Sequence, residues 1–193
     1  MTYNLILAGV GGQGILSIAF VIDQAALAEG LYFLQSEVHG MSQRGGAVQA
    51  HLRLSETEIH SPLIPQGEAD LILSVEPLEA LRYFSYLKPD GVVISSRSPY
   101  INIPDYPPVE DIYREIKRAP VSLLVEADKL AKEAGSLRAE NMVVLGAASV
   151  YLPLREENFK NFISVLFQTK GDKVVNTNLK AFDLGRQAAK GEF

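Results

Sequence analysis

The N-terminal segment, in which an apolar run is followed by a glycine-rich turn and then by a helical pattern, constrains the fold of this chain most strongly. The run Leu5–Ala8 predicts a strand, and apolar residues repeat at helical spacing between Gly14 and Ala28. A turn between a strand and a helix aims backbone N–H groups at whatever lies above it, and the helix dipole favours an anion there. The candidate ligand-binding residues of this first glycine loop are Gly9, Gly11, Gly12, Gln13 and Gly14.

This G-x-G-x-x-G pattern has two interpretations. In the first it is a dinucleotide-type, phosphate-binding turn, which the preceding strand and the following helix favour. In the second the glycines only permit close packing of the strand against the helix. A nicotinamide site would also require an acidic residue near the end of the second strand, and Glu37 stands at about that position.

A second glycine-rich segment, His39–Gly46, follows the apolar run Leu31–Leu34 and carries an unusual number of polar side chains. His39 is a candidate general acid or base, and Arg44 is a candidate clamp for a phosphate or a carboxylate. The alternative is a turn whose glycines adopt positive φ and whose polar side chains cap neighbouring elements. With the residues just before it, this second glycine loop supplies the remaining candidates for cofactor binding, which are Ser36, Glu37, Gln43, Arg44, Gly45 and Gly46.

Strand and helix patterns alternate along the chain, which is typical of an α/β protein with a Rossmann-like, mainly parallel sheet and helices on both faces. Further strands are expected at residues 31–35, 48–54, 69–75, 92–95 and 121–125. A helical C-terminal segment is expected at residues 140–151, 156–167 and 172–189. Because no repeat or linker divides the sequence, residues 1–193 are predicted to form a single domain.

Local patterns add more specific expectations. The strand at 48–54 alternates apolar and polar residues, so it is expected to show one face to water or to lie near a sheet edge. Lys88–Gly91 predicts a turn before the next strand, and the prolines within residues 98–108 predict a long loop or a partner-facing arm. Asp128 is expected to cap a helix, and with Glu126 it flanks a strand end, where α/β sheets bind ligands.

Composition excludes several functions. The formal net charge of −5 argues against a nucleic-acid partner, because nucleic-acid-binding proteins cluster Lys and Arg. The chain has no cysteine, so it cannot ligate an iron–sulfur cluster by itself or supply a thiolate nucleophile. The histidines at 39, 51 and 60 lack the spacing of a helical metal pair, so no metal site is expected. Since no apolar run approaches the length of a membrane span, we expect a cytoplasmic protein with no membrane partner.

Several stretches of the sequence resemble the gamma domain of the 2-oxoacid:ferredoxin oxidoreductases. The resemblance rests on the first glycine loop and above all on the string Ser-Glu-Val-His-Gly-Met-Ser-Gln-Arg-Gly-Gly at Ser36–Gly46. It continues in Asn141–Ala147 and Asn178–Gly185, and it therefore covers nearly the whole chain. It implies an accessory subunit of an enzyme that converts indolepyruvate, or another 2-oxoacid, to an acyl-coenzyme A by oxidative decarboxylation and passes the electrons to ferredoxin.

The resemblance also implies a division of labour between subunits. Thiamine diphosphate and iron–sulfur clusters are expected on a larger partner subunit, which agrees with the absence of cysteine from this chain. This chain is expected to hold no cofactor alone but to contact coenzyme A, whose pyrophosphate would suit the helix start at Gly11–Gly14. We expect the chain to be inactive by itself, and a homodimer is a candidate state of the isolated chain.

Two other classes of function are compatible with parts of the sequence. A free-standing NAD-dependent dehydrogenase is supported by the first glycine loop and Glu37. A non-catalytic interaction protein with a Rossmann-like fold is supported by the lack of a self-contained catalytic set. The second glycine loop and the C-terminal matches favour the oxidoreductase subunit over both.

Overall fold

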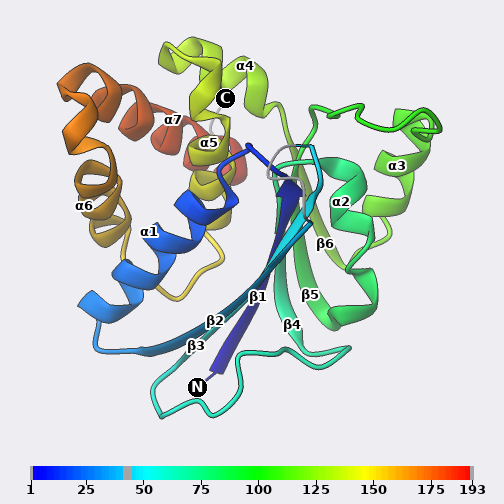
Figure 1. Cartoon of the computed structure of the whole chain (residues 1–193), viewed down its shortest axis with the longest axis horizontal. Coiled ribbons are helices and arrows are strands. Elements are labelled where there is room, and N and C mark those ends of the chain that lie inside the picture. Colours follow the sequence, from blue (N-terminus) through cyan, green and yellow to red (C-terminus); the bar gives the residue numbers. More distant parts are fainter. Residues whose placement is uncertain (1, 41–44, 192–193) are drawn as a thin grey trace.

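A computed structural model gives the structure of the chain, and it describes residues 2–40 and 45–191. In this part of the chain a six-stranded sheet is covered by helices on both faces (Figure 1). The strands are β1 (Thr2–Val10), β2 (Tyr32–His39), β3 (Ala47–Ser55), β4 (Ala69–Ser74), β5 (Leu87–Ser96) and β6 (Val121–Val125). The α-helices are α1 (Ile15–Ala28), α2 (Pro77–Leu81), α3 (Val109–Ile116), α4 (Ala127–Ala134), α5 (Glu140–Ala148), α6 (Glu156–Phe167) and α7 (Asp172–Lys190). Short 3₁₀ turns lie at Phe84–Tyr86, Leu137–Ala139 and Gln168–Lys170.

The strand order is β2-β3-β1-β4-β5-β6. β1, β4, β5 and β6 pair in parallel, whereas β3 pairs antiparallel with both β1 and β2. Five strands therefore run in one direction and β3 alone runs against them, so the expected α/β fold with a mainly parallel sheet is confirmed. The expectation that residues 48–54 lie near a sheet edge is also confirmed, because β3 is the neighbour of the edge strand β2.

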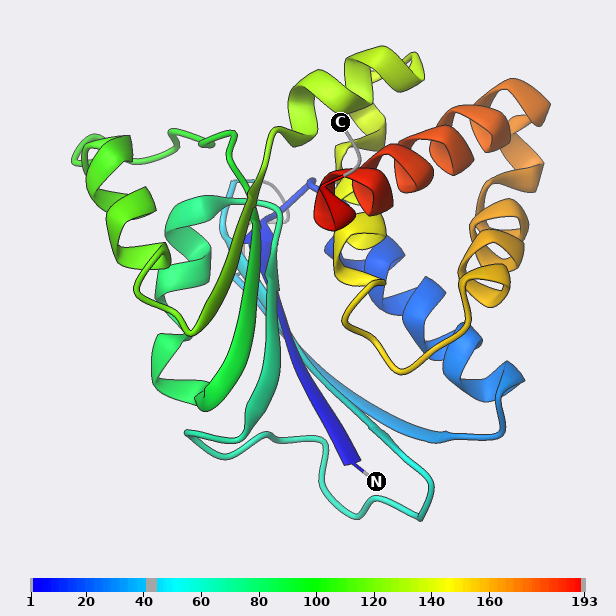
Figure 2. The ribbon, with the colours of Figure 1, turned by 180° about the vertical axis from the view of Figure 1, so that it is seen from behind.

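The two faces of the sheet carry different sets of helices. Side chains alternate along a strand, so Leu5 and Leu7 of β1 face one side and Ile6 faces the other. The Leu5 side forms the larger core cluster with α1, α4, α5, α6 and α7, and the Ile6 side forms a smaller cluster with α2 and α3. Figure 2 shows the same division from behind, with α2 and α3 on one side of the sheet and the larger helical layer on the other.

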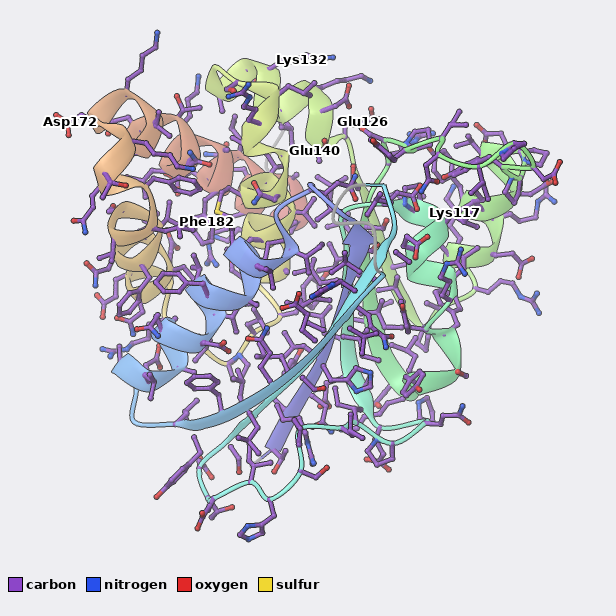
Figure 3. All side chains as sticks on the ribbon, viewed as in Figure 1. Lys117, Glu126, Lys132, Glu140, Asp172 and Phe182 are labelled. Atoms are coloured by element: carbon purple, nitrogen blue, oxygen red, sulfur yellow. The ribbon has the colours of Figure 1, made fainter. Side chains whose placement is uncertain are left out.

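The expected helical C-terminal segment is confirmed, and its helices pack very closely. A Cβ atom added to Gly146 of α5 would lie 2.0 Å from the carbonyl oxygen of Phe182 in α7. A Cβ atom added to Gly185 of α7 would lie 1.9 Å from the carbonyl oxygen of Val143 in α5. The backbones of the two helices are therefore in contact, and the Phe182 ring, labelled in Figure 3, also stacks on Phe159 of α6, with ring centroids 5.7 Å apart.

Two local expectations are wrong. Lys88–Gly91 is not a separate turn but part of β5, where the register with β4 shifts: Ala69 pairs with Leu87, whereas Leu71 pairs with Val92. The extra residues form a bulge, which lets the chain turn without ending the strand.

The expected long loop is confirmed, because the structure has no helix or strand between β5 and α3.

Asp128 does not cap α4, which is the second error. The N-cap residue is Glu126, and Asp128 lies in the first turn of the helix, where its carboxylate pairs with Lys132 at 3.2 Å. Among the described residues, no helix is both long and apolar enough to cross a membrane.

Candidate functional site

The first glycine loop lies at the carboxyl end of β1 and leads directly into α1. Gly12 and Gly14 have φ of +103° and +79°, in the left-handed region that favours glycine. α1 has no acidic residue in its first turn, and within the described part of the chain no side chain caps its start at Gly14. The first N–H groups of a helix have no partner inside it, so this uncapped turn offers donors to an anion.

Neighbouring segments fix the shape of the first glycine loop. The Gln13 amide folds back: its Oε1 accepts the Val10 N–H at 2.7 Å, and its Nε2 donates to the Val75 carbonyl at 3.5 Å. Asn141, the second residue of α5, donates from Nδ2 to the Gly14 carbonyl at 3.2 Å. A Cβ atom added to Gly9 would lie 2.8 Å from the Ile15 side chain, so Gly9 provides close strand–helix packing.

The second glycine loop begins later than the sequence pattern suggested. Ser36, Glu37 and His39 lie on β2 rather than in a loop, because the pairing of β2 with β3 continues until His39 faces Val48. The candidates Gln43 and Arg44 lie outside the described residues. We therefore place Ser36, Glu37 and His39 on a strand, which corrects the expected loop.

Backbone hydrogen bonds join the two glycine loops. The Gly11 N–H donates to the Gly46 carbonyl at 2.8 Å, and the Gly45 N–H donates to the Gly11 carbonyl at 3.2 Å. Asn102, from the long loop between β5 and α3, donates from Nδ2 to the Gly45 carbonyl at 2.7 Å. Two segments that are about 30 residues apart in sequence thus form one structural unit.

A cavity of about 390 Å³ lies beside this unit, between the start of α1 and the ends of β2 and β3. It brings together five of the sequence candidates with apolar neighbours, and its lining is Val10, Gly11, Gly12, Gly14, Ile15, Leu16, Glu37, His39 and Val48. Ser36 does not line it, since adjacent strand positions point to opposite faces. The described lining of the cavity therefore presents backbone donors, one carboxylate and one imidazole to a ligand.

The chemistry of this cavity suits binding better than independent catalysis. The imidazole of His39 can donate to an anion or accept a proton, and the carboxylate of Glu37 can accept from a hydroxyl or amine. Among the described residues that line the cavity there is no serine, threonine, lysine or cysteine. Within the residues that the structure describes, no group of acidic and histidine side chains is placed to hold a metal ion.

Polar residues also lie at the carboxyl ends of β4 and β5, and they were not among the site residues predicted from the sequence. Glu76, which follows β4, is 1% exposed and accepts the Glu79 N–H at 2.8 Å. Glu140, at the start of α5, accepts from the Ser96 hydroxyl at 2.7 Å, and burial raises the pKa of this carboxyl. Glu76 is a polar residue directly after the predicted strand 69–75, and this position was the signal by which the sequence could have identified it. Figure 3 shows Glu140 at the same end of the sheet as Glu126.

The carboxylates that the sequence analysis did select at the β6 end are engaged in surface ion pairs. Glu126 pairs with Arg97 at 2.9 Å and with Lys129 at 2.8 Å, and Asp128 pairs with Lys132. Exposed pairs of this kind contribute little to stability. Glu126 and Asp128 do not line the cavity beside the glycine loops.

Comparison with known proteins identifies relatives along the whole chain. The family described as pyruvate ferredoxin/flavodoxin oxidoreductase matches residues 4–188. The indolepyruvate oxidoreductase subunit IorB of Pyrococcus horikoshii is 41% identical over 97% of this chain and 96% of its own length. The subunit of the same name from Thermococcus kodakarensis is 39% identical over the same shares of the two chains.

Solved structures agree with this similarity. A 2-oxoglutarate:ferredoxin oxidoreductase from Magnetococcus marinus, solved with 2-oxoglutarate, coenzyme A and succinyl-CoA bound, has a TM-score of 0.80 and 25% identity, and the match covers 98% of this chain and 31% of that chain. The pyruvate oxidoreductase subunit PORC of Thermotoga maritima shares the fold, with a TM-score of 0.73 at 18% identity over 96% of both chains. The chain therefore belongs to the pyruvate ferredoxin/flavodoxin oxidoreductase family, as an accessory subunit of the 2-oxoacid:ferredoxin oxidoreductase type.

Proposed function

We propose that this chain is the accessory subunit of a cytoplasmic indolepyruvate:ferredoxin oxidoreductase and that its cavity helps to bind coenzyme A. The observation that carries the proposal is the similarity, over nearly the full length of both chains, to subunits named for indolepyruvate. The enzyme would convert the 2-oxoacid to an acyl-coenzyme A, with the electrons passing to ferredoxin. In this assembly residues 1–193 act as one gamma-type domain.

Coenzyme A fits the cavity on chemical grounds. Its pyrophosphate is an anion, and the start of α1 offers backbone N–H groups with no acidic side chain in the first turn. A Cβ atom added to Gly12 would meet nothing within 4 Å, so a ligand can approach the backbone there. His39 and Glu37 then lie across the cavity, where they can hold polar groups of the ligand. Coenzyme A supplies the thiol that receives the acyl group.

Decarboxylation and electron transfer require groups that this chain cannot supply. The chain has no cysteine, and no serine, threonine or lysine is among the described residues that line its cavity. Thiamine diphosphate and the iron–sulfur clusters are expected on a larger partner subunit, which supplies that chemistry. We therefore expect the purified chain to be inactive, and a homodimer is a candidate state of the chain when its partner is absent.

The test is reconstitution with the partner subunit and a matched pair of glycine variants. Gly12 and Gly30 both have positive φ, and an added Cβ meets nothing within 4 Å at either position. Alanine at either site should therefore cost about 1–2 kcal/mol of stability. Only Gly12→Ala should raise the KM for coenzyme A, by about tenfold, because a methyl group there obstructs the pyrophosphate.

Indolepyruvate-dependent reduction of ferredoxin is measured for this chain alone, for the partner alone and for the mixture. Turnover is expected only in the mixture. Robust turnover by this chain alone would contradict the subunit role, and equal effects of Gly12→Ala and Gly30→Ala on the KM for coenzyme A would contradict the assigned site.

A further inference from the structure

Glu76 is a buried carboxylate that takes hydrogen bonds from two distant parts of the chain. It lies two residues beyond the end of β4, and it is 1% exposed. Oε2 accepts the Glu79 N–H at 2.8 Å, which caps the short helix α2. Oε1 accepts the Tyr100 N–H at 3.3 Å and also the hydroxyl of Tyr106.

The helix cap alone does not account for this residue. A cap needs one oxygen, and shorter side chains such as Ser, Asp or Asn are the preferred N-caps. The longer glutamate has a second oxygen that reaches the loop between β5 and α3, residues 97–108, which we call the arm. All three groups that contact Glu76 are donors, and a carboxylate is the side chain that only accepts. Glu76 therefore holds the arm as well as the helix.

The arm continues from Glu76 to the second glycine loop. Two residues beyond Tyr100, Asn102 donates to the Gly45 carbonyl at 2.7 Å. The Gly45 N–H in turn donates to Gly11, which lines the cavity. Hydrogen bonds at Tyr100 and Asn102, joined by the backbone of the arm between them, thus connect the buried carboxylate to the cavity wall. The residue before Glu76 also contributes, since the Val75 carbonyl accepts from Gln13 of the first glycine loop.

We propose that Glu76 is a positioning residue for the ligand cavity: by holding the arm through Tyr106 and Tyr100, it fixes Gly45 against Gly11 at the cavity wall. The inference rests on the proposed function only in naming coenzyme A as the ligand whose affinity responds. Its consequence for structure, the hydrogen-bonded contact of Gly45 with Gly11, is independent of that ligand.

Amide hydrogen exchange of the full chain tests the structural step. Tyr106→Phe removes one hydroxyl from Glu76 and should speed exchange of the Tyr100, Gly45 and Gly11 N–H groups by about fivefold or more. Asn102→Ala breaks the series further along, so it should speed exchange at Gly45 and Gly11 but not at Tyr100. Tyr86→Phe is the matched control, because Tyr86 lies against the same small core cluster and is not among the groups that bond Glu76.

Steady-state kinetics of the reconstituted complex tests the functional step. Tyr106→Phe and Asn102→Ala should raise the KM for coenzyme A by about tenfold while kcat stays within about twofold, and Tyr86→Phe should change neither. If the Glu76→Gln variant folds, it should show the same rise in the KM for coenzyme A as Tyr106→Phe. If Glu76→Gln does not fold, the kinetics of Tyr106→Phe test the role of Glu76.

The outcomes separate this inference from the proposed function. If the reconstituted enzyme does not depend on coenzyme A, the proposed function is contradicted. The exchange measurement then tests the positioning role of Glu76 independently of the ligand. Unchanged exchange at Gly45 and Gly11 in Tyr106→Phe overturns the inference. An unchanged KM in both arm variants of a coenzyme A-dependent enzyme also overturns it.

Discussion

Asp23 is the residue whose ionisation should most affect folding. It lies on α1 with its side chain 6% exposed, and its Oδ1 has no hydrogen-bond partner among the described residues. Burial raises the pKa of this carboxyl to about 7, because the charged form loses its hydration. In the unfolded chain the same carboxyl has a pKa near 4.

This difference in pKa predicts an unusual dependence of stability on pH. Between about pH 4 and pH 7 the folded chain keeps the Asp23 proton that the unfolded chain has released, so the free energy of unfolding falls as pH rises. Each pKa unit corresponds to about 1.4 kcal/mol, so we expect a loss of about 2–4 kcal/mol that is complete above pH 7. Asp23→Asn should be more stable than the natural chain at pH 8 and should lose this slope.

Urea unfolding at pH 5, 6, 7 and 8 measures the effect. Asp90→Asn serves as the control, since Asp90 is exposed and its removal should leave the slope unchanged. If the free energy of unfolding of Asp23→Asn falls with pH as steeply as that of the natural chain, Asp23 is not the group responsible.

At the scale of the elements, the contact between α5 and α7 is the most sensitive part of the fold. Alanine at Gly146 would bring a methyl group within 2.0 Å of the Phe182 carbonyl oxygen, which belongs to backbone and cannot move aside as a side chain can. We expect Gly146→Ala to force the helices apart and to cost about 3 kcal/mol or more in unfolding free energy, at the upper end of overpacking effects.

Gly40→Ala is the matched control for this prediction. Its φ is not positive, and an added Cβ would meet nothing within 4 Å. Thermal unfolding of the two variants compares them directly. Equal melting temperatures would show that the two helices can separate without cost, contrary to the geometry.

The sequence predicts best those elements whose bounds follow from the spacing of their own apolar residues. The bounds predicted for Glu156–Phe167 and Val121–Val125 match α6 and β6 exactly as the structure has them, because apolar spacing alone defines both. The second half of β2 was missed because three of its four residues are polar and the segment becomes a strand only by pairing with β3. Glu76 was missed because its partner Tyr106 is 30 residues away along the chain.

At the scale of the whole molecule, the strand order departs from the dinucleotide-binding fold. In that fold the second strand lies beside the first, so its terminal acidic residue reaches the ribose of a nucleotide bound on the first loop. Here β3 lies between β1 and β2. Such an insertion cannot be read from periodicity, because local sequence does not specify which strands pair. The position of Glu37 near the end of the second strand was predicted correctly, but β3 separates that strand from β1.

The strand order bears directly on whether the chain is a nicotinamide dehydrogenase. Neighbouring strands are about 4.8 Å apart, so the intervening β3 places the end of β2 about 10 Å from β1 instead of about 5 Å. Glu37 and Gly11 still line one cavity, but we expect the added width of one strand to keep the carboxylate from the usual ribose contact. We therefore expect NAD to bind more weakly than about 1 mM, which corresponds to less than about 4 kcal/mol of binding free energy.

Titration calorimetry with NAD and with NADP measures this on the purified chain, and Glu37→Ala provides the control. If the topology excludes the nicotinamide nucleotides, the natural chain and Glu37→Ala give the same flat titration, since the carboxylate has no ribose to hold. Micromolar binding of NAD by the natural chain that is lost in Glu37→Ala would restore the dehydrogenase function. That result would mean that the ligand spans the width of β3, with Glu37 holding its ribose hydroxyl and the N–H groups at the start of α1 holding its pyrophosphate.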